Sequence, residues 1–304
     1  MRKYLYTLAA LVGMAQLSFA QGTDALPFTQ IDRNPVTSAL AGAGAASNAT
    51  AAYSAFSNAA MLPFFEGKME TAASYQLWSP SSAKSNNITA GAAYKFSDKF
   101  ALSLGYSLQS AAAYEVQDYS GQITGTFSPK EQVIALGMGI GLGDKLSLGI
   151  NARYAIQKLS DKVSFNGFSG DVMLAFAPSD GLRFAAGVST LGNKISSATR
   201  KDFSQPAHAV LGAEFAPIDG LKVDAEVDYY FSKNYAAALG AEYCFNDLIY
   251  VRAGYRYASQ YAVIPSHLGL GLGAKFAGIC LDLSYLTASP ALGNTINIGL
   301  RFSL

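Results

Sequence analysis

Hydrophobic and polar residues alternate one by one over the last ten residues of the chain, 295–304. The even-numbered positions there are large and apolar, whereas the odd-numbered ones are polar or small and include Arg301. Because successive side chains of a β-strand point to opposite faces, this pattern predicts a strand with one apolar and one polar face. The pattern recurs from about residue 66 onward and predicts fourteen strands. They are expected at 68–78, 87–97, 99–110, 131–143, 145–158, 165–177, 182–191, 207–217, 221–232, 235–246, 248–258, 266–277, 279–288 and 295–304.

The links between these strands alternate between short and long. Turn residues make the short links, at 97–98, 143–144, 179–181, 219–220, 246–247 and 278. The longer links are 79–86, 111–130, 159–164, 192–206, 259–265 and 289–294. The link at 232–234 departs from the pattern because it is short where a long one is expected. An even number of strands with short turns at one end is typical of a bacterial outer-membrane β-barrel, whose short turns are periplasmic. We therefore predict an all-β fold, a transmembrane antiparallel barrel of about fourteen strands.

Aromatic residues support this assignment. Strands that run towards the short turns end in phenylalanine on the predicted outward face, at Phe96, Phe176, Phe215, Phe245, Phe276 and Phe302. Since aromatic side chains favour the membrane–water interface, these residues indicate a periplasmic girdle. An outer girdle is expected from Trp78, Tyr106, Tyr229, Tyr257 and Tyr285. The alternative is a soluble β-sandwich or lipocalin-like barrel, which would bury the apolar face inside.

Composition and the N-terminus point to the same compartment. Of 304 residues, 50% are hydrophobic and only 14% are charged, against about 25% in ordinary soluble domains. A net charge of +1 gives no reason to expect a nucleic-acid partner. Residues 1–20 form a predicted signal peptide: Arg2 and Lys3 precede an apolar stretch, and a small-residue cleavage site ends at Ala20. We expect the mature protein in the outer membrane of a Gram-negative bacterium, in contact with lipid.

Residues 21–65 differ from the rest because they are rich in Ala, Gly, Ser and Asn and do not alternate. Gly also recurs at every second position within strands, as at Gly137–Gly141 and Gly269–Gly273, and strand glycines mark places where other backbone comes close. We predict that residues 21–65 form a small plug with short helices inside a barrel made by residues 66–304. Its larger side chains are candidates for a ligand pocket or for seating the plug. They are Leu26, Phe28, Phe56, Asn58, Met61, Leu62, Phe64 and Phe65.

Charged residues on the inward face alternate in sign around the predicted wall. We expect Lys275, Asp282, Arg301 and Glu70 to be neighbours if the last strand closes on the first, with Glu242 and Arg252 on the adjoining strands. Charges in a partly dehydrated lumen need partners, so a wall network or plug anchor is favoured over an ion-selecting ring. The two cysteines, Cys244 and Cys280, fall three strands apart, too far for a disulfide, and are expected to be free and inward-facing.

Catalytic or metal chemistry is not indicated. The chain has two histidines, His208 and His267, both near strand starts on the loop side, where a hydrogen-bonding role at the loop edge is expected. No Ser-centred elbow and no zinc-ligand spacing accompanies them. We expect no enzyme activity and no cofactor.

The predicted layout of fourteen strands and an N-terminal plug resembles the FadL superfamily of outer-membrane proteins. Within it, residues 27–47 are similar to the opening Phe-x-x-Ile segment and Gly-Ala-Gly-Ala helix of the PorV/PorQ group of Bacteroidetes. Residues 53–60 stand where that family has Tyr-x-Asn-Pro-Ala, with Ala59 in place of the proline, so only Asn58 and Ala60 match.

The resemblance implies two different functions. FadL-like proteins are passive channels for small hydrophobic or amphipathic molecules, in which the plug holds the ligand and a kink in the wall releases it sideways. PorV-like proteins are accessory proteins of type IX secretion that bind secretion-system or secreted proteins instead of passing solutes. An uptake channel is the favoured interpretation and the secretion role is the alternative.

Overall fold

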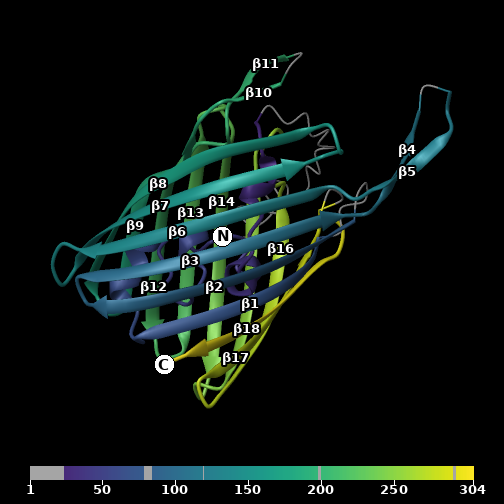
Figure 1. Ribbon diagram of the computed structural model, residues 1–304. Helices are drawn as coiled ribbons and strands as arrows, with labels where there is room; N and C mark the ends of the chain where they lie inside the picture. Colours follow the sequence, from purple (N-terminus) through teal and green to yellow (C-terminus); the bar gives the residue numbers. More distant parts are fainter. Residues whose placement is uncertain (1–23, 79–83, 119, 198–199, 290–291) are drawn as a thin grey trace, which may run out of the picture.

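The computed structural model describes residues 24–78, 84–118, 120–197, 200–289 and 292–304, and the predicted signal peptide lies outside them. Within these residues, fourteen antiparallel strands form a closed barrel, which confirms the predicted fold class (Figure 1). Each strand pairs with its neighbour in sequence order, and all fourteen coincide with predicted strands to within a few residues. The wall consists of β1 (Met69–Trp78), β2 (Ser85–Ser97), β3 (Phe100–Ala111), β6 (Lys130–Gly141), β7 (Leu146–Lys158), β8 (Ser164–Ser179), β9 (Leu182–Gly192), β12 (His208–Ile218), β13 (Leu221–Tyr230), β14 (Tyr235–Phe245), β15 (Ile249–Ala258), β16 (His267–Phe276), β17 (Ile279–Thr287) and β18 (Thr295–Ser303).

The seam between the first and last strands is fully paired. β18 pairs with β17 on one side and with β1 on the other, in a register that places Ser303 opposite Glu70 and Ile296 opposite Leu77. The carbonyl of Leu304 also accepts hydrogen bonds from the N–H groups of Lys68 and Met69. Closure leaves no strand edge in the wall, which is what lipid requires of a β-structure.

The two ends of the barrel differ as expected. At the turn end, strands are joined by tight turns, and that between β16 and β17 uses Ala277 and Gly278, both with positive φ, as a two-residue hairpin of this type requires. At the loop end, two extra hairpins extend the connections: β4 (Tyr114–Gln117) with β5 (Ile123–Phe127), and β10 (Ile195–Ser197) with β11 (Arg200–Phe203). The β4–β5 hairpin projects well away from the wall (Figure 1).

The outward face is apolar and the six predicted girdle phenylalanines all lie on it, with 37 to 80% of each side chain exposed. Trp78 corrects the prediction. It shares the parity of Gln76 and Glu70, so its side chain points into the lumen and packs near Leu26 and Phe28. Trp78 is the last residue of β1, and its inward position follows from the alternation of the strand. The prediction was wrong because it used the aromatic side chain and not the parity.

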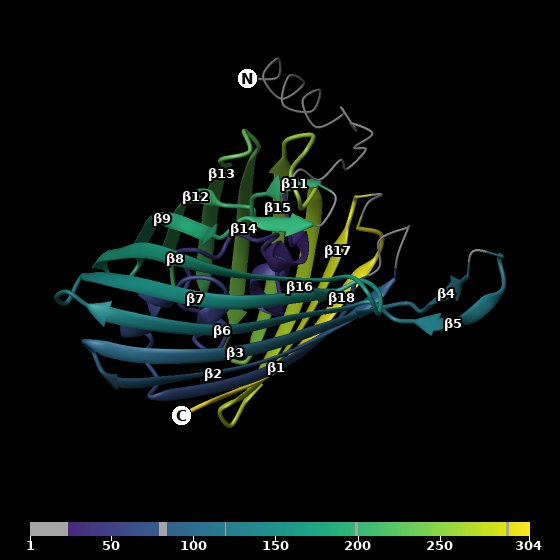
Figure 2. The ribbon, with the colours of Figure 1, turned by 45° about the horizontal axis from the view of Figure 1, so that its top comes forward.

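The N-terminal segment fills much of the lumen, as the dark purple ribbon inside the barrel shows (Figure 2). It contains η1 (Pro27–Gln30), α2 (Pro35–Ala39), η2 (Ser54–Phe56) and η3 (Ala59–Phe64). Asn34 caps α2 and Asn58 caps η3, each by accepting a hydrogen bond from the N–H two residues later. No helix in the described ranges is long and apolar enough to cross a membrane.

Wall glycines let the plug approach closely. Of the predicted Gly-x-Gly runs, Gly137, Gly139, Gly269 and Gly271 face the plug, whereas Gly141 and Gly273 face other residues of the barrel. A Cβ added at Gly254 would lie 2.3 Å from the carbonyl carbon of Leu40, and one added at Gly149 would lie 2.1 Å from the nitrogen of Ala60. No side chain fits in such spaces. The wall and the plug are therefore shaped to each other by small residues on both sides.

Wall side chains also satisfy the polar backbone of the plug. The amide of Asn151 donates to the carbonyls of Ser54 and Ser57, at 3.0 Å each. The Glu226 carboxylate accepts from the N–H groups of Gly44 and Ala45, at 2.9 and 2.7 Å. Since a buried backbone group without a partner is costly, these contacts replace the secondary structure that the plug lacks.

Candidate functional site

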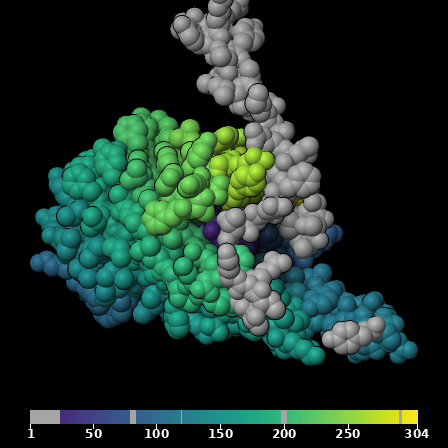
Figure 3. Space-filling view, turned by 90° about the horizontal axis from the view of Figure 1, so that it is seen from above, coloured from purple at the N-terminus to yellow at the C-terminus, as the bar shows by residue number. Residues whose placement is uncertain are grey.

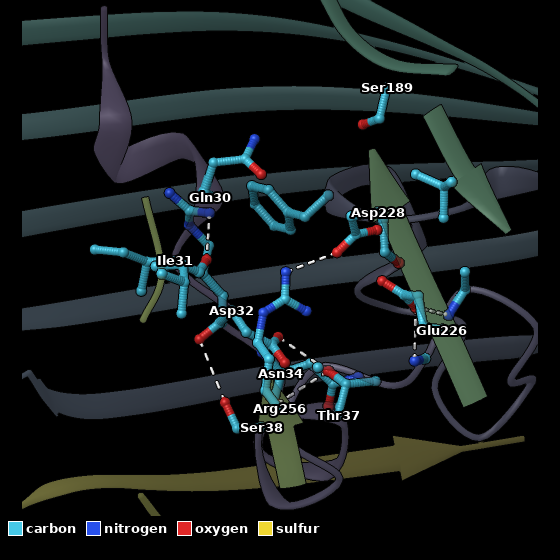
Figure 4. A pocket seen from close by; sticks show the side chains of 18 of the residues that line it. Gln30, Ile31, Asp32, Asn34, Thr37, Ser38, Ser189, Glu226, Asp228 and Arg256 are labelled. Atoms are coloured by element: carbon cyan, nitrogen blue, oxygen red, sulfur yellow. Dashed lines mark hydrogen bonds and ion pairs between the residues drawn. The ribbon is translucent and has the colours of Figure 1, made fainter. Parts of the chain in front are cut away.

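A cavity of about 170 Å³ lies between the plug and the wall in the loop-side half of the lumen (Figure 4). The plug contributes residues of η1, α2 and η2 and the links between them. The wall contributes side chains from β1, β7, β8, β9, β12, β13, β15, β16 and β17. Seen from above, a small purple part of the N-terminal segment is visible beside the green part of the wall (Figure 3).

The wall side of the cavity is an ion pair with an aromatic neighbour. Nη2 of Arg256 donates to Oδ2 of Asp228 at 2.7 Å, and Figure 4 shows the Arg256 guanidinium pointing across the cavity towards that carboxylate. The Tyr230 hydroxyl lies 3.5 Å from the same nitrogen. The pair is held by a single short contact. Nε of Arg256 and Oδ1 of Asp228 are buried and have no hydrogen-bond partner among the described residues.

A β-bulge forms another part of the wall side. β8 and β9 pair regularly up to Gly170 and again from Val172, so Asp171 stands alone opposite Ser189 and Thr190. The Asp171 carboxylate fills the break: it accepts from the Thr190 N–H at 2.7 Å and from the Ser189 hydroxyl at 2.8 Å, and it pairs with Arg153. Ser189 and Arg153 line the cavity, so the cavity reaches the one bulge found away from strand ends in the described wall.

The plug side carries a buried cation, Arg33. Its guanidinium donates to the carbonyls of Phe28, Thr29 and Ile31 and to the Ser107 hydroxyl, and it lies over the Phe56 ring. Burial lowers the pKa of Arg33 to about 10, which still leaves it charged at neutral pH. It thus fixes the first turn of the plug through backbone contacts instead of an ion pair.

Asp32, the neighbour of Arg33, also lines the cavity. Its Oδ1 accepts from the Asn34 N–H at 3.0 Å and from the Thr37 hydroxyl at 2.9 Å, while Oδ2 is buried without a partner. Burial raises the pKa of Asp32, and these hydrogen bonds oppose the rise.

Both histidines of the chain line the cavity. His208 and His267 sit at the start of β12 and β16, and Nδ1 of each lies 2.9 Å from the carbonyl two residues earlier, of Pro206 and Pro265. Because a carbonyl only accepts, Nδ1 carries the proton and Nε2 of each neutral ring is an acceptor. These are the predicted loop-edge hydrogen bonds. The sequence did not indicate that both rings point into the lumen.

The predicted pocket residues divide into three groups. Phe56 and Asn58 line the cavity. Leu26 and Phe28 belong to an apolar cluster with Trp78 and Ile195 at the loop side. The rest seat the plug near the turn end, and these are Met61, Leu62, Phe64 and Phe65.

The predicted charge network forms at the turn end, away from the cavity. Arg252 contacts Glu242 at 2.5 Å and Asp282 at 2.7 Å, and Arg301 contacts Asp282 at 2.9 Å and Glu70 at 3.6 Å. Five of the six predicted residues thus form one chain across the seam. It also holds the plug, because Arg301 donates to the Ala49 carbonyl and Glu70 accepts from the Ala52 N–H.

Lys275 corrects this prediction. It stands opposite Cys280, next to the turn, and its side chain is exposed. Arg252 contacts Asp282 in place of Lys275. The Arg252 guanidinium crosses β16 at Gly273 to reach that carboxylate. A Cβ at Gly273 would lie 2.8 Å from Oδ1 of Asp282 and 2.9 Å from Nη1 of Arg252, so the glycine makes the contact possible.

Cys244 and Cys280 are free, on β14 and β17, as predicted. Among the described residues, no group of three or more His, Cys, Asp and Glu side chains is arranged to hold a metal ion. The cavity residues that the sequence reasoning missed are Asp32, Arg33, Arg153, Asp228, Tyr230 and Arg256. The inward parity of the four wall residues was readable from the sequence, but their common height in the barrel was not. Asp32 and Arg33 lie in the plug, where no alternation indicates direction.

Several solved structures share this fold. The toluene transporter TodX of Pseudomonas putida matches with a TM-score of 0.63 and 15% identity, over 89% of this chain and 97% of that one. The monoaromatic hydrocarbon channel CymD matches with a TM-score of 0.65 and 14% identity over the same shares. A FadL homologue of Pseudomonas aeruginosa matches with a TM-score of 0.53 and 12% identity, over 89% of this chain and 95% of that one.

No protein-family model matches the chain. No curated protein matches it either. The likeness shows that the chain has the same barrel fold as these solved structures. Membership of the PorV/PorQ group stays a prediction.

Proposed function

We propose that the protein is an outer-membrane channel for the passive uptake of small hydrophobic or amphipathic molecules. The observation that carries the proposal is the cavity enclosed between plug and wall, inside a barrel whose outer face is apolar. The structural neighbours described as a toluene transporter and a monoaromatic hydrocarbon channel support the same function.

The bulge at Asp171 is the proposed exit. At the bulge, the Thr190 N–H is held by the Asp171 carboxylate instead of by the neighbouring strand, so opening the wall there breaks fewer ladder hydrogen bonds than opening a regular part of it. A ligand that enters at the loop end and reaches Ser189 would leave between β8 and β9 into the lipid. A molecule with apolar character gains free energy by that step, which gives the uptake a direction without an energy source.

The test is uptake by whole cells of a Gram-negative host, because the polar outer leaflet of such cells slows hydrophobic compounds that cross simple bilayers freely. Cells producing the protein should take up labelled toluene or a small amphipathic aromatic faster than cells with the empty vector. Val172 and Val188 face each other beside the bulge. When both are replaced by cysteine, uptake should fall after oxidation to a disulfide and recover on reduction. Cysteines at Ala241 and Ala253, an opposed pair in regular wall, are the control. Equal uptake with and without the protein would refute the proposal.

The alternative function is a PorV/PorQ-like role in protein binding, and one feature favours it. The β4–β5 hairpin stands clear of the barrel, and Tyr114 and Ile123 on it are 42 and 59% exposed. A two-stranded hairpin is only marginally stable alone, so a protein partner would stabilise it. Deleting residues 113–127 should leave uptake unchanged if the protein is a channel and should abolish copurification of secretion-system proteins if it is a PorV-like adaptor.

A further inference from the structure

The outward face of the barrel wall carries two charged residues in the fourteen described strands, Lys130 and Lys158. Every other charged residue of these strands has the parity of the lumen. Lys130 begins β6 and Lys158 ends β7, so both are at the loop end, and both are exposed. β6 and β7 lie side by side (Figure 1), and the two lysines are directly opposite each other in their ladder. The charge of the outward face is therefore concentrated at one point of the rim.

This pairing of like charges needs a physical reason. Directly opposed side chains of an antiparallel pair have their Cβ atoms about 5 Å apart, and like charges there are destabilising. Lysines that merely reach for water from the rim would repel each other less if they were spread around the barrel. Asp161 lies 3.7 Å from Lys158, but its side chain is 80% exposed, and such surface pairs contribute little. Lys130 has no ion pair among the described residues. The two lysines thus remain a site for an anion.

The neighbouring outward positions supply further donors. Gln132 on β6 and Asn166 on β8 lie one outward row closer to the middle of the wall. The Tyr106 hydroxyl donates to Oε1 of Gln132 at 3.1 Å, which leaves the amide N–H groups of Gln132 free to donate. No Asp or Glu has outward parity in the described strands. We call Lys130, Lys158, Gln132 and Asn166 the lysine face, and its chemistry suits a group with several anionic oxygens.

The depth of the lysine face in the membrane follows from the rows beside it. The next outward row contains Tyr106, Tyr154 and Phe168, and the rings of Tyr154 and Phe168 are 4.5 Å apart. Aromatic side chains of this kind lie at the membrane–water interface. The lysines are four residues beyond that row, about 13 Å along tilted strands, which places them among lipid headgroups. On the other side of the aromatic row, exposed Leu104 and Leu136 continue the surface as hydrocarbon-facing wall.

We propose that the lysine face binds the phosphate-bearing head of a lipid in the outer leaflet, whose acyl chains lie along the apolar rows of β3, β6 and β7. The two ammonium groups flank the phosphate, which turns their mutual repulsion into shared attraction, and the amides donate to its other oxygens. The occupant is a lipid because the cations and the apolar rows belong to one continuous lipid-facing surface. The proposal requires that the loop end faces the cell surface, and it does not depend on what passes through the lumen.

The first test compares probes that share parts of this chemistry. Purified protein in non-ionic detergent is mixed with bisphosphorylated lipid A or with its dephosphorylated form, and bound lipid is measured by native mass spectrometry. The phosphorylated lipid should bind at least tenfold more tightly, and a tenfold molar excess of inorganic phosphate should not displace it. Equal binding of the two lipids would mean that the acyl chains alone adsorb to the barrel. Displacement by inorganic phosphate would mean an ion site without lipid specificity. Either result overturns the proposal.

Variants then locate the head. Lys130→Gln with Lys158→Gln should weaken lipid A about 25-fold, because each lysine at an anionic membrane surface contributes about fivefold. Arginine at both positions keeps the charges and should keep the binding. Lys194→Gln with Lys233→Gln is the matched control, since it removes two exposed lysines at the loop end away from the lysine face. Retention of the heat-modifiable band on gels shows that each variant is folded. A folded glutamine pair at 130 and 158 with parental affinity, or an equal loss in the control, would refute the site.

Stability separates lipid binding from a structural role of the lysines. In lipid-free detergent, Lys130→Gln should raise the midpoint of unfolding slightly, because it relieves the repulsion of Lys158. Lipid A should raise the midpoint of the parent and leave that of the double glutamine variant unchanged. A lower midpoint for Lys130→Gln without lipid, or an equal effect of lipid A on both proteins, would show that the lysines serve the fold and not a lipid.

Discussion

The two halves of the lumen are filled by the same plug but in opposite ways. In the turn-side half, every charge of the Glu242–Arg252–Asp282–Arg301–Glu70 chain has a partner, and small residues of the plug touch glycines of the wall. In the loop-side half, larger polar side chains surround a cavity and several of their atoms have no partner. Unpartnered atoms also occur near the turn end, at Oε2 of Glu214 and Oδ1 of Asp224, so the contrast is between the complete charge chain at the seam and the lining of the cavity.

The difference shows why counting charges does not locate function. Both halves are rich in arginine and carboxylate, and both bury them. Buried ion pairs contribute little net stability when complete, but removing one partner leaves a costly unpaired charge. A complete network is therefore most sensitive to loss of a member, whereas an incomplete one has capacity left for a ligand.

The largest effect is expected from Asp282→Ala in the turn-side half. Asp282 is 1% exposed and accepts from both Arg252 and Arg301, so its removal leaves two buried guanidinium groups short of a partner. We expect a loss of about 3–5 kcal/mol, enough to prevent most of the protein from assembling. The measurement is the folded fraction in outer-membrane extracts, read by heat modifiability. Lys275→Ala is the control, since its side chain is exposed, and a folded fraction for Asp282→Ala equal to that control would contradict the distinction.

A smaller loss is expected from Gly273→Val, which fills the space through which Arg252 reaches Asp282. Overpacking of this kind costs about 1–3 kcal/mol. The midpoint of denaturant unfolding, followed by Trp78 fluorescence, should fall accordingly. Gly125→Val is a matched control, because nothing lies within 4 Å of a Cβ at that position in the β5 strand. Equal midpoints for the two variants would show that the crossing contact is dispensable.

In the loop-side half, the double change Asp228→Asn with Arg256→Gln should alter stability by less than about 1 kcal/mol, because both charges of the pair leave together. Its unfolding midpoint should therefore stay near that of the parent. A midpoint as low as that of Gly273→Val would mean that the loop-side pair seals the lumen too, and the contrast between the halves would fail.

The sequence sufficed for the wall but not for the cavity, and the physics of alternation explains both results. A period of two fixes which face each side chain takes, so Ile298 and Arg301 could be assigned from their neighbours, and the fourteen strands followed. Register across strands was harder. Asp282 and Arg301 lie on adjacent strands, so a single strand register brings them together. Asp228 and Arg256 lie on either side of β14, so their contact depends on two successive registers.

The plug was predictable in composition and not in contacts. Its Ala and Gly content indicated close packing, and the strand glycines that receive it were found from their spacing. Which of its side chains face the cavity depends on the path of a segment with only short helices, and no periodicity marks that path. Phe56 and Asn58 line the cavity, while Met61 and Leu62, only a few residues on, seat the plug.

The smallest effect is a pH dependence at the plug side of the cavity. Burial raises the pKa of Asp32, so the ionised form is less favoured in the folded protein than in the unfolded chain. A raised carboxyl pKa contributes stability that is full below its ordinary value of about 3.9 and is lost as pH rises through the raised value. Asp32→Asn keeps an oxygen to accept from the Asn34 N–H and the Thr37 hydroxyl but has no charge to bury. The variant should therefore match the parent near pH 3.5 and be slightly more stable, by less than about 1 kcal/mol, at pH 7. Unfolding midpoints at the two pH values measure this. A variant that is less stable at pH 7 would show that the Asp32 charge is satisfied by its hydrogen bonds within the plug.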